Sequence, residues 1–513
     1  MKKRFNITGL CINSKHYMVD ISDKTDKIIS MIKYGDYFTI NRPRQFGKTT
    51  TLNILCNMLH KDYVVIKTSF EGVGSDMFNS ESLFCGTILK IFSTSIMSRE
   101  PEYAELLLSY GNIRSFTELS FTFSDFIRKC DRPVILMIDE VDKSSNSKIF
   151  IQFLGLLRNK YLTSAEGCDT SFQSVILAGV HDIRTLKLAI RDENDVRFNS
   201  PWNISAEFDI DMSFNPKEIE GMLLEYQSDK GVSMDITKLS ALIHMFTSGY
   251  PYLVSGICKI IDESLNAVWT ENSVYWAVSC MLDKKNTLFE DVIKNIENNQ
   301  DTKAVVNQIL IQGRIVNYNP YAYEKGLIYG IFRKKGKRLV IHNMIFEELI
   351  YNYMVEQEHI MKMQVPVLIA EQDKYTADGE LQLENVLLRF QEFMYQEYRK
   401  EDESFYEAQG RLIFLAYLKP ILNGRGFYFV EPETRENKRL DVVIVFGGNK
   451  YVVELKLWNG KSYEEKGISQ LSEYLDIQGL PEGYLLIFNF NINKHTAAEW
   501  IEINGKRIFE VIV

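Results

Sequence analysis

The sequence predicts a multidomain α/β protein, and three observations carry that prediction. Short apolar strands alternate with amphipathic helical stretches from Tyr37 to about Asn215, which is the pattern of a parallel sheet covered by helices. Residues then recur at helical spacing from Lys217 to about Gln300, and the last quarter of the chain mixes helices with strands. A chain of 513 residues is also too long for a single hydrophobic core, so several domains are expected.

The composition is that of an ordinary globular protein, with 45% hydrophobic and 25% charged residues. The net charge is 59 minus 68, or −9, so the chain lacks the overall positive charge of a bulk nucleic-acid binder and any such contact must be local. Seven cysteines without a CxxC pair indicate reduced thiols and a cytoplasmic protein. We expect no secretory signal and no membrane partner, because no apolar run approaches the ~20 residues that span a bilayer.

The segment RPRQFGKT, residues 42–49, follows the P-loop pattern GxxxxGK[ST] except that Arg42 occupies the first glycine position. In a P-loop, glycines let backbone N–H groups approach the phosphates, the lysine neutralises them and the hydroxyl binds Mg²⁺. The context supports the match, because a strand precedes the segment and Thr50 to Leu59 has the pattern of a helix whose N-terminus would face the anion. The residues expected to bind ATP here are Arg44, Gly47, Lys48, Thr49 and Thr50, with Thr49 also on Mg²⁺.

A second element of the predicted nucleotide site is an acidic pair. Asp139 and Glu140 follow the apolar run Val134 to Ile138 and end a predicted buried strand. A parallel strand that delivers an acidic pair at its carboxyl end suits Mg²⁺ coordination by Asp139 and polarisation of the attacking water by Glu140. The alternative is a core strand that ends in a solvated turn. The strands expected in this part of the chain, which Asn215-Pro216 closes, are 37–41, 63–70, 133–138, 174–179 and 208–212.

Further polar side chains follow the fourth of these strands. His181 and Asp182 stand where such ATPases often carry a group that senses the γ-phosphate, although Asp182 also suits a helix N-cap. Candidate arginine fingers follow, for which a solvated charged face is the alternative: Arg184, Arg191 and Arg197.

Together these motifs resemble the bacterial AAA-ATPase-like family, which is related to archaeal-type and STAND P-loop ATPases. The resemblance rests on RPRQFGKT, LMIDEVD, AGVHD and SGYPY at 248–252, and it covers roughly residues 1–260. It implies that Gly249 and Pro251 contact the nucleotide opposite the P-loop, together with residues 16–20. On the residues alone, Gly249 and Pro251 would indicate a helix break.

The middle of the chain is predicted to form a helical lid followed by a winged-helix-like module. Two strand-like runs, Leu327 to Phe332 and Leu339 to His342, flank the basic turn Arg333 to Arg338, and a helix follows from Met344. The tip of such a hairpin can lie against a DNA backbone, or it can simply be solvated. A helical connector from about Glu356 to Tyr398 then leads to strands expected at 427–430, 439–446, 451–456 and 484–488.

The last quarter places Asp441 13 residues before the pair Glu454 and Lys456. Side chains alternate along a strand, so Glu454 and Lys456 project from the same side. A turn with its tip at Gly448-Asn449 would bring Asp441 onto the same face by residue count. Carboxylates that hold Mg²⁺ beside a basic group are what phosphodiester hydrolysis needs. The alternative is an exposed edge strand with a simple ion pair.

This arrangement resembles the PD-(D/E)xK nuclease core over about residues 385–513, and nucleases of this kind are commonly fused to the AAA-ATPase-like domain. The resemblance implies a site role for Gln470 and Tyr474, which recur at i and i+4 on the next helix. It also implies an additional acidic residue, Glu407, on the preceding helix, while Arg439 stands where it can meet a phosphate.

The sequence therefore predicts a P-loop ATPase domain in residues 1–215, a helical lid and winged-helix-like module in 216–355, a helical connector in 356–384 and a nuclease-like domain in 385–513. The expected function is binding and hydrolysis of ATP together with Mg²⁺-dependent cleavage of nucleic acid, DNA in the first place. The alternative is a nucleotide-switched signalling or assembly protein, possible as a homo-oligomer, whose nuclease fold binds nucleic acid without cutting. The expected catalytic residues are Glu140, Asp441, Glu454, Lys456 and Gln470, and the expected metal ligands are Thr49, Asp139, Asp441 and Glu454.

Overall fold

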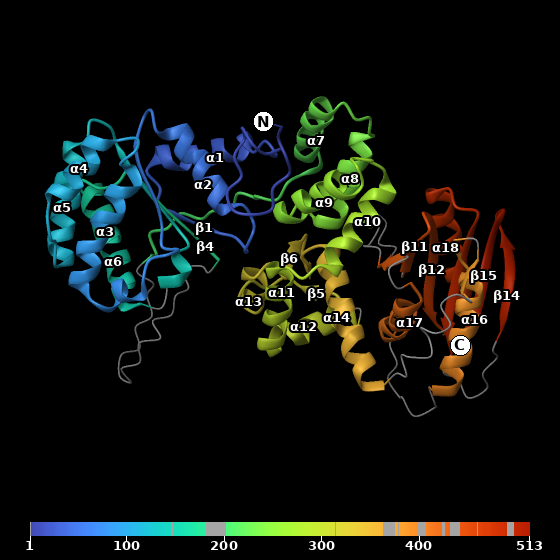
Figure 1. The fold of residues 1–513 in the computed structure, drawn as a ribbon. Coiled ribbons are helices and arrows are strands. Elements are labelled where there is room, and N and C mark those ends of the chain that lie inside the picture. Colours follow the sequence, from blue (N-terminus) through green and yellow to red (C-terminus); the bar gives the residue numbers. More distant parts are fainter. Residues whose placement is uncertain are drawn as a thin grey trace, which may run out of the picture. The chain divides into compact units, whose positions relative to one another are not determined.

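The computed structural model divides into two compact units, and Figure 1 shows the ribbon of the chain. The first unit comprises residues 1–230, 250–256 and 328–330, and the second comprises 231–249, 257–327 and 331–513. The structure describes residues 2–144, 147–180, 202–312, 314–362, 375–377, 379–397, 407–422, 426–430, 442–458, 460–489 and 497–513.

The first unit is built on a parallel sheet of four strands in the order β1-β4-β3-β2. The two inner strands, β3 and β4, are buried at every residue, as expected for apolar runs that helices cover on both faces. This sheet with its helices confirms the prediction of a parallel α/β fold of the P-loop type. Its strands are β1 (Phe38–Asn41), β2 (Val64–Ser69), β3 (Val134–Asp139) and β4 (Ser174–Gly179).

Helices cover the sheet, and several begin at a serine whose hydroxyl accepts a hydrogen bond from the backbone of the first turn. Phenylalanines of α3, α5 and α6 pack with residues of β2, β3 and β4 in the main core of the unit. The helices are α1 (Ser22–Tyr34), α2 (Lys48–Leu59), α3 (Glu81–Ile96), α4 (Pro101–Ser109), α5 (Phe116–Lys129), α6 (Lys148–Ala165) and α7 (Pro216–Lys230), with short 3-10 turns at Ser75–Asn79 and Val141–Ser144.

The prediction of a fifth strand at 208–212 was wrong. Only a single parallel bridge, between Phe38 and Ala206, forms beside β1. The Phe208 ring stacks on Phe38 at a centroid distance of 5.8 Å, so the apolar contact that the pattern predicted is made. The carbonyl of Ile210, however, accepts a hydrogen bond from the Arg42 guanidinium. A side chain therefore takes a backbone acceptor that a strand ladder would have used.

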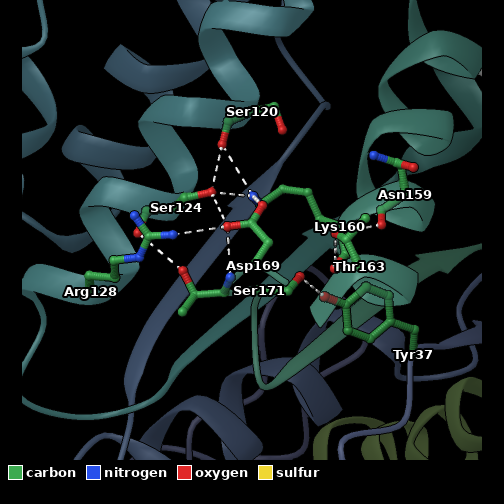
Figure 2. A network of polar contacts seen from close by, with 10 residues as sticks. Tyr37, Ser120, Ser124, Arg128, Asn159, Lys160, Thr163, Asp169 and Ser171 are labelled. Carbon is green, nitrogen blue, oxygen red and sulfur yellow. Dashed lines mark hydrogen bonds and ion pairs between the residues drawn. The ribbon is translucent and has the colours of Figure 1, made fainter. Parts of the chain in front are cut away.

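A buried polar network joins α5, α6 and the loop before β4 (Figure 2). The Lys160 ammonium is fully buried and donates to Ser124 Oγ at 2.6 Å, to Asp169 Oδ2 at 2.8 Å and to the Ser120 carbonyl at 3.2 Å. Burial by itself would raise the pKa of Asp169, but hydrogen bonds from Lys160 and Ser124 outweigh it and lower the pKa. Beside the network, the Tyr37 hydroxyl lies 2.7 Å from the Ser171 hydroxyl. A buried charge satisfied in this way fixes the packing of the two helices.

The second unit begins with helices, which confirms the helical spacing seen in the sequence. A small sheet follows in the order β5-β7-β6, and β6 and β7 form the predicted basic hairpin. The prediction of a strand at 327–332 was wrong. Residues 324–328 form a short helix, and the strand begins only at Phe332. The elements are α8 (Ile236–Thr247), α9 (Pro251–Ser264, shared between the units), α10 (Glu271–Asp283), α11 (Thr287–Asn298), α12 (Gln300–Leu310), β5 (Val316–Asn317), α13 (Glu324–Ile328), β6 (Phe332–Lys335), β7 (Arg338–Ile341) and α14 (Met344–Lys362).

The C-terminal part of the second unit is a six-stranded mixed sheet in the order β10-β11-β12-β13-β15-β14. Strands β12, β13 and β15 are parallel, whereas β10, β11 and the edge strand β14 are antiparallel to their neighbours. A short hairpin of β8 (Thr376–Ala377) and β9 (Glu380–Leu381) interrupts the connector before α16. The strands are β10 (Gly426–Phe429), β11 (Val442–Phe446), β12 (Asn449–Leu457), β13 (Glu482–Phe488), β14 (Ala498–Ile503) and β15 (Lys506–Ile512).

Helices pack on both faces of this sheet. Leucines of α18 (Lys461–Gln478) join Val452 and Leu485 in a core cluster on one face. On the other face, Phe488 meets the ring of Phe390 in α16 (Leu383–Glu397) and the backbone of Gly410 in α17 (Glu407–Leu422). Of the four strands expected here, all are present within the described residues, but β14 and β15 were not predicted.

Candidate functional site

The segment between β1 and α2 turns sharply into the helix. Gly47 adopts a left-handed conformation with φ 80° and caps α2, and Gln45 also has a positive φ of 57°. A left-handed residue at this position suits glycine, since a Cβ would be strained there. The first N–H groups of α2 have no partner inside the helix and face the segment, which makes this end of α2 suited to bind an anion.

The Lys48 side chain lies folded beneath the loop. Its Nζ donates to the carbonyl oxygens of Arg42 at 2.9 Å and Pro43 at 3.0 Å, and only 7% of the residue is exposed. Burial lowers the pKa of Lys48, while the charge of Glu140 acts in the opposite direction. A cation held by carbonyls at the mouth of a helix N-terminus is placed to exchange those oxygens for phosphate oxygens.

Thr49 and Asp139 come together from positions 90 residues apart. The Thr49 hydroxyl donates to Asp139 Oδ2 at 2.6 Å, and Asp139 is 3% exposed at the carboxyl end of β3. The next residue, Glu140, has a positive φ of 54°, and its N–H donates to Asp139 Oδ1 at 3.0 Å. Burial raises the pKa of Glu140 and Lys48 opposes the change. A hydroxyl and a carboxylate in contact form the oxygen pair that Mg²⁺ prefers.

The conformation of Arg42 explains why this position of the loop does not need a glycine. The residue does not adopt a positive φ, and its guanidinium donates to the carbonyls of Asn41, at 2.8 Å, and Ile210. It also lies over the Phe208 ring at 5.2 Å. Arg42 is therefore bound to the segment beside β1, and only its carbonyl contacts Lys48.

Asp142 is a site residue that sequence reasoning missed, although it belongs to the quoted LMIDEVD run. Its Oδ2 accepts from the Val180 N–H at 2.5 Å, and a Cβ on Gly179 would come 2.9 Å from its Oδ1. Asp142 thus ties the ends of β3 and β4 together, and its charge also acts on Lys48. Candidates that lie outside the described residues are His181, Asp182, Arg184, Arg191 and Arg197.

A cavity of about 680 Å³ opens beside this loop within the first unit. Thr49 and Thr50 form part of its wall, and the Cys11 N–H donates to Thr50 Oγ1 at 3.4 Å. Of residues 16–20, Tyr17, Met18 and Val19 line the cavity, whereas His16 and Asp20 do not. The remaining wall is largely apolar and includes Leu10, Ile21, Phe46, Ile54, Met212, Phe214, Pro251 and Tyr252, with Glu71 as its one acidic residue among those described.

Tyr250, just before α9, and Gly330 also contact the loop. The Tyr250 hydroxyl donates to the carbonyl of Arg44, and its ring meets Phe46 edge-on at 4.7 Å. Gly330, with φ 70°, lies so close to Pro43 that a Cβ would come 2.5 Å from Pro43 Cγ. Pro251 lines the cavity. Gly249 belongs to the second unit, where its N–H donates to Thr247 Oγ1 at 3.1 Å.

In the second unit, Glu454 and Lys456 form a buried pair on β12. The Glu454 side chain is 1% exposed and lies 2.6 Å from the Lys456 Nζ, whose side chain is 16% exposed. The β11–β12 turn has its tip at Gly447-Gly448, one residue earlier than expected, and the described pairing ends at Val442 opposite Val453. Asp441 and Arg439 lie outside the described residues, as does the Glu407 side chain in α17.

Gln470 and Tyr474 both belong to α18, as the spacing predicted. Gln470 is half-buried, and Tyr474 is part of the core cluster beneath the helix. The Tyr474 hydroxyl accepts from Lys450 Nζ at 3.3 Å, and Lys450 also donates to Gln478 at 2.8 Å. The described contacts of Tyr474 therefore lie near the start of β12, four residues before Glu454.

Glu510 on β15 is a second buried carboxyl on this sheet, and it was not among the predicted site residues because β15 was not predicted. The strand register aligns Glu454, Leu485 and Glu510 in one row, so their side chains share a face. Glu510 is 3% exposed, and burial, together with the charges of Glu464 and Glu499, raises its pKa to about 7.

Three further properties concern metal ligands, cysteines and the length and polarity of the helices. Among the described residues, no group of three or more His, Cys, Asp or Glu side chains is arranged to hold a metal ion. All seven cysteines are free thiols, in agreement with the sequence pattern. Within the described part of the chain, every helix is too short or too polar to cross a lipid bilayer.

Comparison with known proteins adds a family match. A family model for an AAA-like domain matches residues 8–354. No curated protein matches the sequence. Among solved structures, a Walker-type ATPase of Pyrococcus abyssi is similar, at 11% identity and a TM-score of 0.43, over 67% of this chain and 99% of that one. The ORC1 protein of Aeropyrum pernix, solved with DNA, is similar at 10% identity and a TM-score of 0.31, over 65% of this chain and 93% of that one.

Proposed function

The chain belongs to the AAA-like domain family, and from that premise we propose that its first unit binds ATP with Mg²⁺ and hydrolyses it. The observation that carries the proposal is the contact of 2.6 Å between Thr49 and Asp139, beside the buried Lys48 and a cavity of about 680 Å³. A threonine hydroxyl and an aspartate carboxylate suit Mg²⁺, and a helix N-terminus with a lysine suits phosphates. The residues present therefore fit both groups.

Each residue of the site then has a task. Lys48 exchanges its carbonyl acceptors for phosphate oxygens, while Thr49 and Asp139 hold the metal ion. Bound Mg²⁺ supplies positive charge against the phosphates. Glu140, next to Asp139 and partly desolvated, orients the attacking water. The apolar wall of the cavity, including Tyr17 and Phe214, accepts the base of the nucleotide.

The nucleotide site can be tested with variants that separate binding from hydrolysis. Lys48→Ala should weaken ATP binding roughly tenfold to a hundredfold, because it removes a charged hydrogen-bond donor to the phosphates. Glu140→Gln should keep binding and lose hydrolysis. The matched control is Lys61→Ala, an exposed lysine on the turn after α2. Calorimetric ATP binding that is equal for Lys48→Ala and Lys61→Ala would contradict the proposed site.

A chemical probe gives an independent readout. Cys11 lines the cavity, whereas Cys168 is exposed on the turn after α6. We expect ATP to protect Cys11 from a thiol reagent while Cys168 is modified at an unchanged rate, as measured by mass spectrometry of the peptides. Equal modification of Cys11 with and without ATP would place the nucleotide elsewhere.

For the C-terminal sheet we propose a Mg²⁺-dependent nuclease that cleaves nucleic acid, DNA in the first place. Support comes from the buried pair of Glu454 and Lys456 on a central strand of a mixed sheet with helices on both faces. In this proposal Asp441 and Glu454 hold the metal ion, which would neutralise charge on the scissile phosphate. Lys456 orients the attacking water or stabilises the developing charge, and Gln470 contacts the site from α18.

The nuclease is tested by metal-dependent cleavage of plasmid and single-stranded DNA. Lys456→Ala should lose cleavage, whereas Lys450→Ala, on the same strand but bound to Tyr474 and Gln478, should keep it. Cleavage by both variants at the wild-type rate would reject the catalytic role of Lys456. Absence of cleavage by the wild type under every nucleotide condition would reject the nuclease.

A second candidate is a nucleotide-switched assembly protein that binds nucleic acid without cutting it. One observation favours it: the hairpin of β6 and β7 carries cations such as Lys335 and Arg338, which can bind a phosphate backbone without cleaving it. It predicts ATP-dependent self-association and retention of intact DNA. Light scattering with and without ATP, together with a cleavage assay on the same sample, separates the two functions.

A further inference from the structure

A segment around the small sheet of the second unit has a charge opposite to that of the whole chain. Residues 314–338 contain seven basic side chains and one acidic side chain, Glu324, which gives +6, whereas the whole chain carries −9. Such a local excess of cations creates a positive surface on an otherwise acidic protein. The basic residues are Arg314, Lys325, Arg333, Lys334, Lys335, Lys337 and Arg338.

The strand register places three of these cations, Arg333, Lys335 and Arg338, on one face of the sheet. Lys335 pairs with Arg338, and Arg338 pairs with Asn317, so the three side chains lie in one row on the same face. Arg333 is two residues before Lys335 and shares that face, whereas Phe332 and Leu339 are buried on the other. The basic face is therefore a property of the fold, since the apolar alternate residues anchor the hairpin in the core.

Local contacts hold the hairpin in shape. The Arg333 Nε donates to the carbonyl of His342 at 2.6 Å, and the N–H of Tyr318 donates to the carbonyl of Lys337 at 2.9 Å. The Lys334 ammonium lies over the Tyr318 ring at 5.2 Å. The turn itself is closed by Gly336, with φ 62°, and Lys337. Cations presented on a fixed frame lose less conformational entropy on binding than cations on a loose loop.

The same segment of the chain exposes a large aromatic side chain. Tyr321 is 91% exposed in the turn between β5 and α13, and Asn319 fixes that turn by accepting from the N–H of Tyr321 at 3.0 Å. Ile315, before β5, is 65% exposed. Exposed aromatic rings beside cations are the combination that contacts both the phosphates and the bases or sugars of a nucleic acid.

We propose that this basic face, formed by Arg333, Lys335 and Arg338 together with Lys337 of the adjoining turn, binds the phosphate backbone of nucleic acid. Cations two residues apart on one strand repeat at about 6.6 Å. Each DNA strand presents closely spaced phosphates, so cations at this spacing can contact neighbouring phosphates of one strand. The inference names a surface for the nucleic-acid partner of the proposed function and rests on that partner, but it does not depend on cleavage.

The test measures binding of the full chain to a fluorescent duplex of about 30 base pairs, by anisotropy in EDTA so that no cutting occurs. Lys335→Ala/Lys337→Ala/Arg338→Ala should bind roughly tenfold or more weakly at about 50 mM salt, because three phosphate contacts are lost. The slope of log affinity against log salt should become shallower by about 0.9 for each lost contact. Tyr321→Ala should weaken binding to single strands more than to the duplex.

The matched control is Lys284→Ala/Lys285→Ala/Lys303→Ala, which removes three exposed lysines of the same unit outside the basic face. Equal affinity and equal salt slope for the two triple variants would overturn the inference, as would wild-type binding to anionic vesicles but not to DNA. Should the triple variant unfold, the single substitution Lys337→Ala at the turn replaces it. Loss of cleavage with binding and salt slope intact would count against the nuclease alone.

Discussion

Each unit contains a buried lysine–carboxylate pair, and the two pairs differ in which partner is the more buried. In the first unit Lys160 is the more buried partner, with a side chain 1% exposed, and Asp169 is 24% exposed. In the second unit the order is reversed, because Glu454 is 1% exposed and Lys456 is 16% exposed. Lys160 sits among hydroxyl and carbonyl oxygens, whereas Glu454 lies on a strand between the buried Val453 and Leu455.

We expect this difference to separate a structural pair from a functional one. A buried charge costs desolvation energy that hydrogen bonds must offset, and the serines around Lys160 provide them. A carboxylate placed in an apolar strand, with its lysine reaching toward solvent, is a poor way to stabilise a sheet. The proposed task of this carboxylate, holding a metal ion, would account for its position.

The largest effect is expected from breaking the first pair. Lys160→Met leaves the partly exposed Asp169 carboxylate with Arg128, at 3.3 Å, as its remaining cation, and should lower the free energy of unfolding by on the order of 3 kcal/mol. Urea denaturation followed by circular dichroism measures this change. Lys129→Met, which breaks an exposed pair with Asp125 on the same unit, is the control and should change stability little. If the two variants are equally stable, the network of Figure 2 does not fix the packing of α5 and α6.

The second pair should respond in the opposite way. Replacing both partners, Glu454→Gln/Lys456→Met, removes the desolvation cost and should leave stability unchanged within about 1–2 kcal/mol. Cleavage, however, should fall by on the order of 100-fold or more, because the charged groups that face the phosphate are lost. Loss of both stability and cleavage to the same degree would make this pair structural, like Lys160 with Asp169.

The comparison also shows what the sequence can predict. Motifs confined to one loop or strand, such as Gly47-Lys48-Thr49, were located from local patterns, and the buried apolar strands of the parallel sheet were predicted because their residues form continuous apolar runs. Contacts between distant segments were not predictable in this way. Two such contacts are the hydrogen bond from the Val180 N–H to Asp142 and the hydrogen bond from the Arg42 guanidinium to the Ile210 carbonyl. Both depend on which strand ends lie next to each other.

The errors have different causes. The segment 208–212 alternates like a strand, yet the Arg42 side chain takes its backbone acceptor, a tertiary event with no local signature. Strands β14 and β15 were missed although Asn504-Gly505, with φ values of 50° and 74°, is a turn signal between two alternating runs. Glu510 was missed with them, so the row that it forms with Glu454 appears only in the structure.

A smaller effect is expected where the first unit holds its loop. Gly330→Ala places a Cβ about 2.5 Å from Pro43 at a φ of 70°, so the backbone or the loop must shift. A strained left-handed alanine costs roughly 1–2 kcal/mol, and we expect weaker ATP binding with the Glu454 pair unaffected. Gly336→Ala has nearly the same φ but open space around it and serves as the control. Equal ATP affinity of the two variants would show that the contact with Pro43 has no influence on the loop.

The smallest effect is a pH dependence in the sheet of the second unit. The folded pKa of Glu510 is raised to about 7 by burial and by Glu464 and Glu499, above its ordinary value of 4.5. The proton is held more tightly in the folded chain, so its stabilising effect is complete below pH about 4.5 and is lost as pH rises through 7. Glu510→Gln should remove that decline, worth roughly 1 kcal/mol after allowance for solvent screening. Urea unfolding from pH 5 to 8 measures it, with the exposed Glu502→Gln on β14 as control. Parallel curves for wild type and Glu510→Gln would show that the pKa of this carboxyl is not raised in the folded chain.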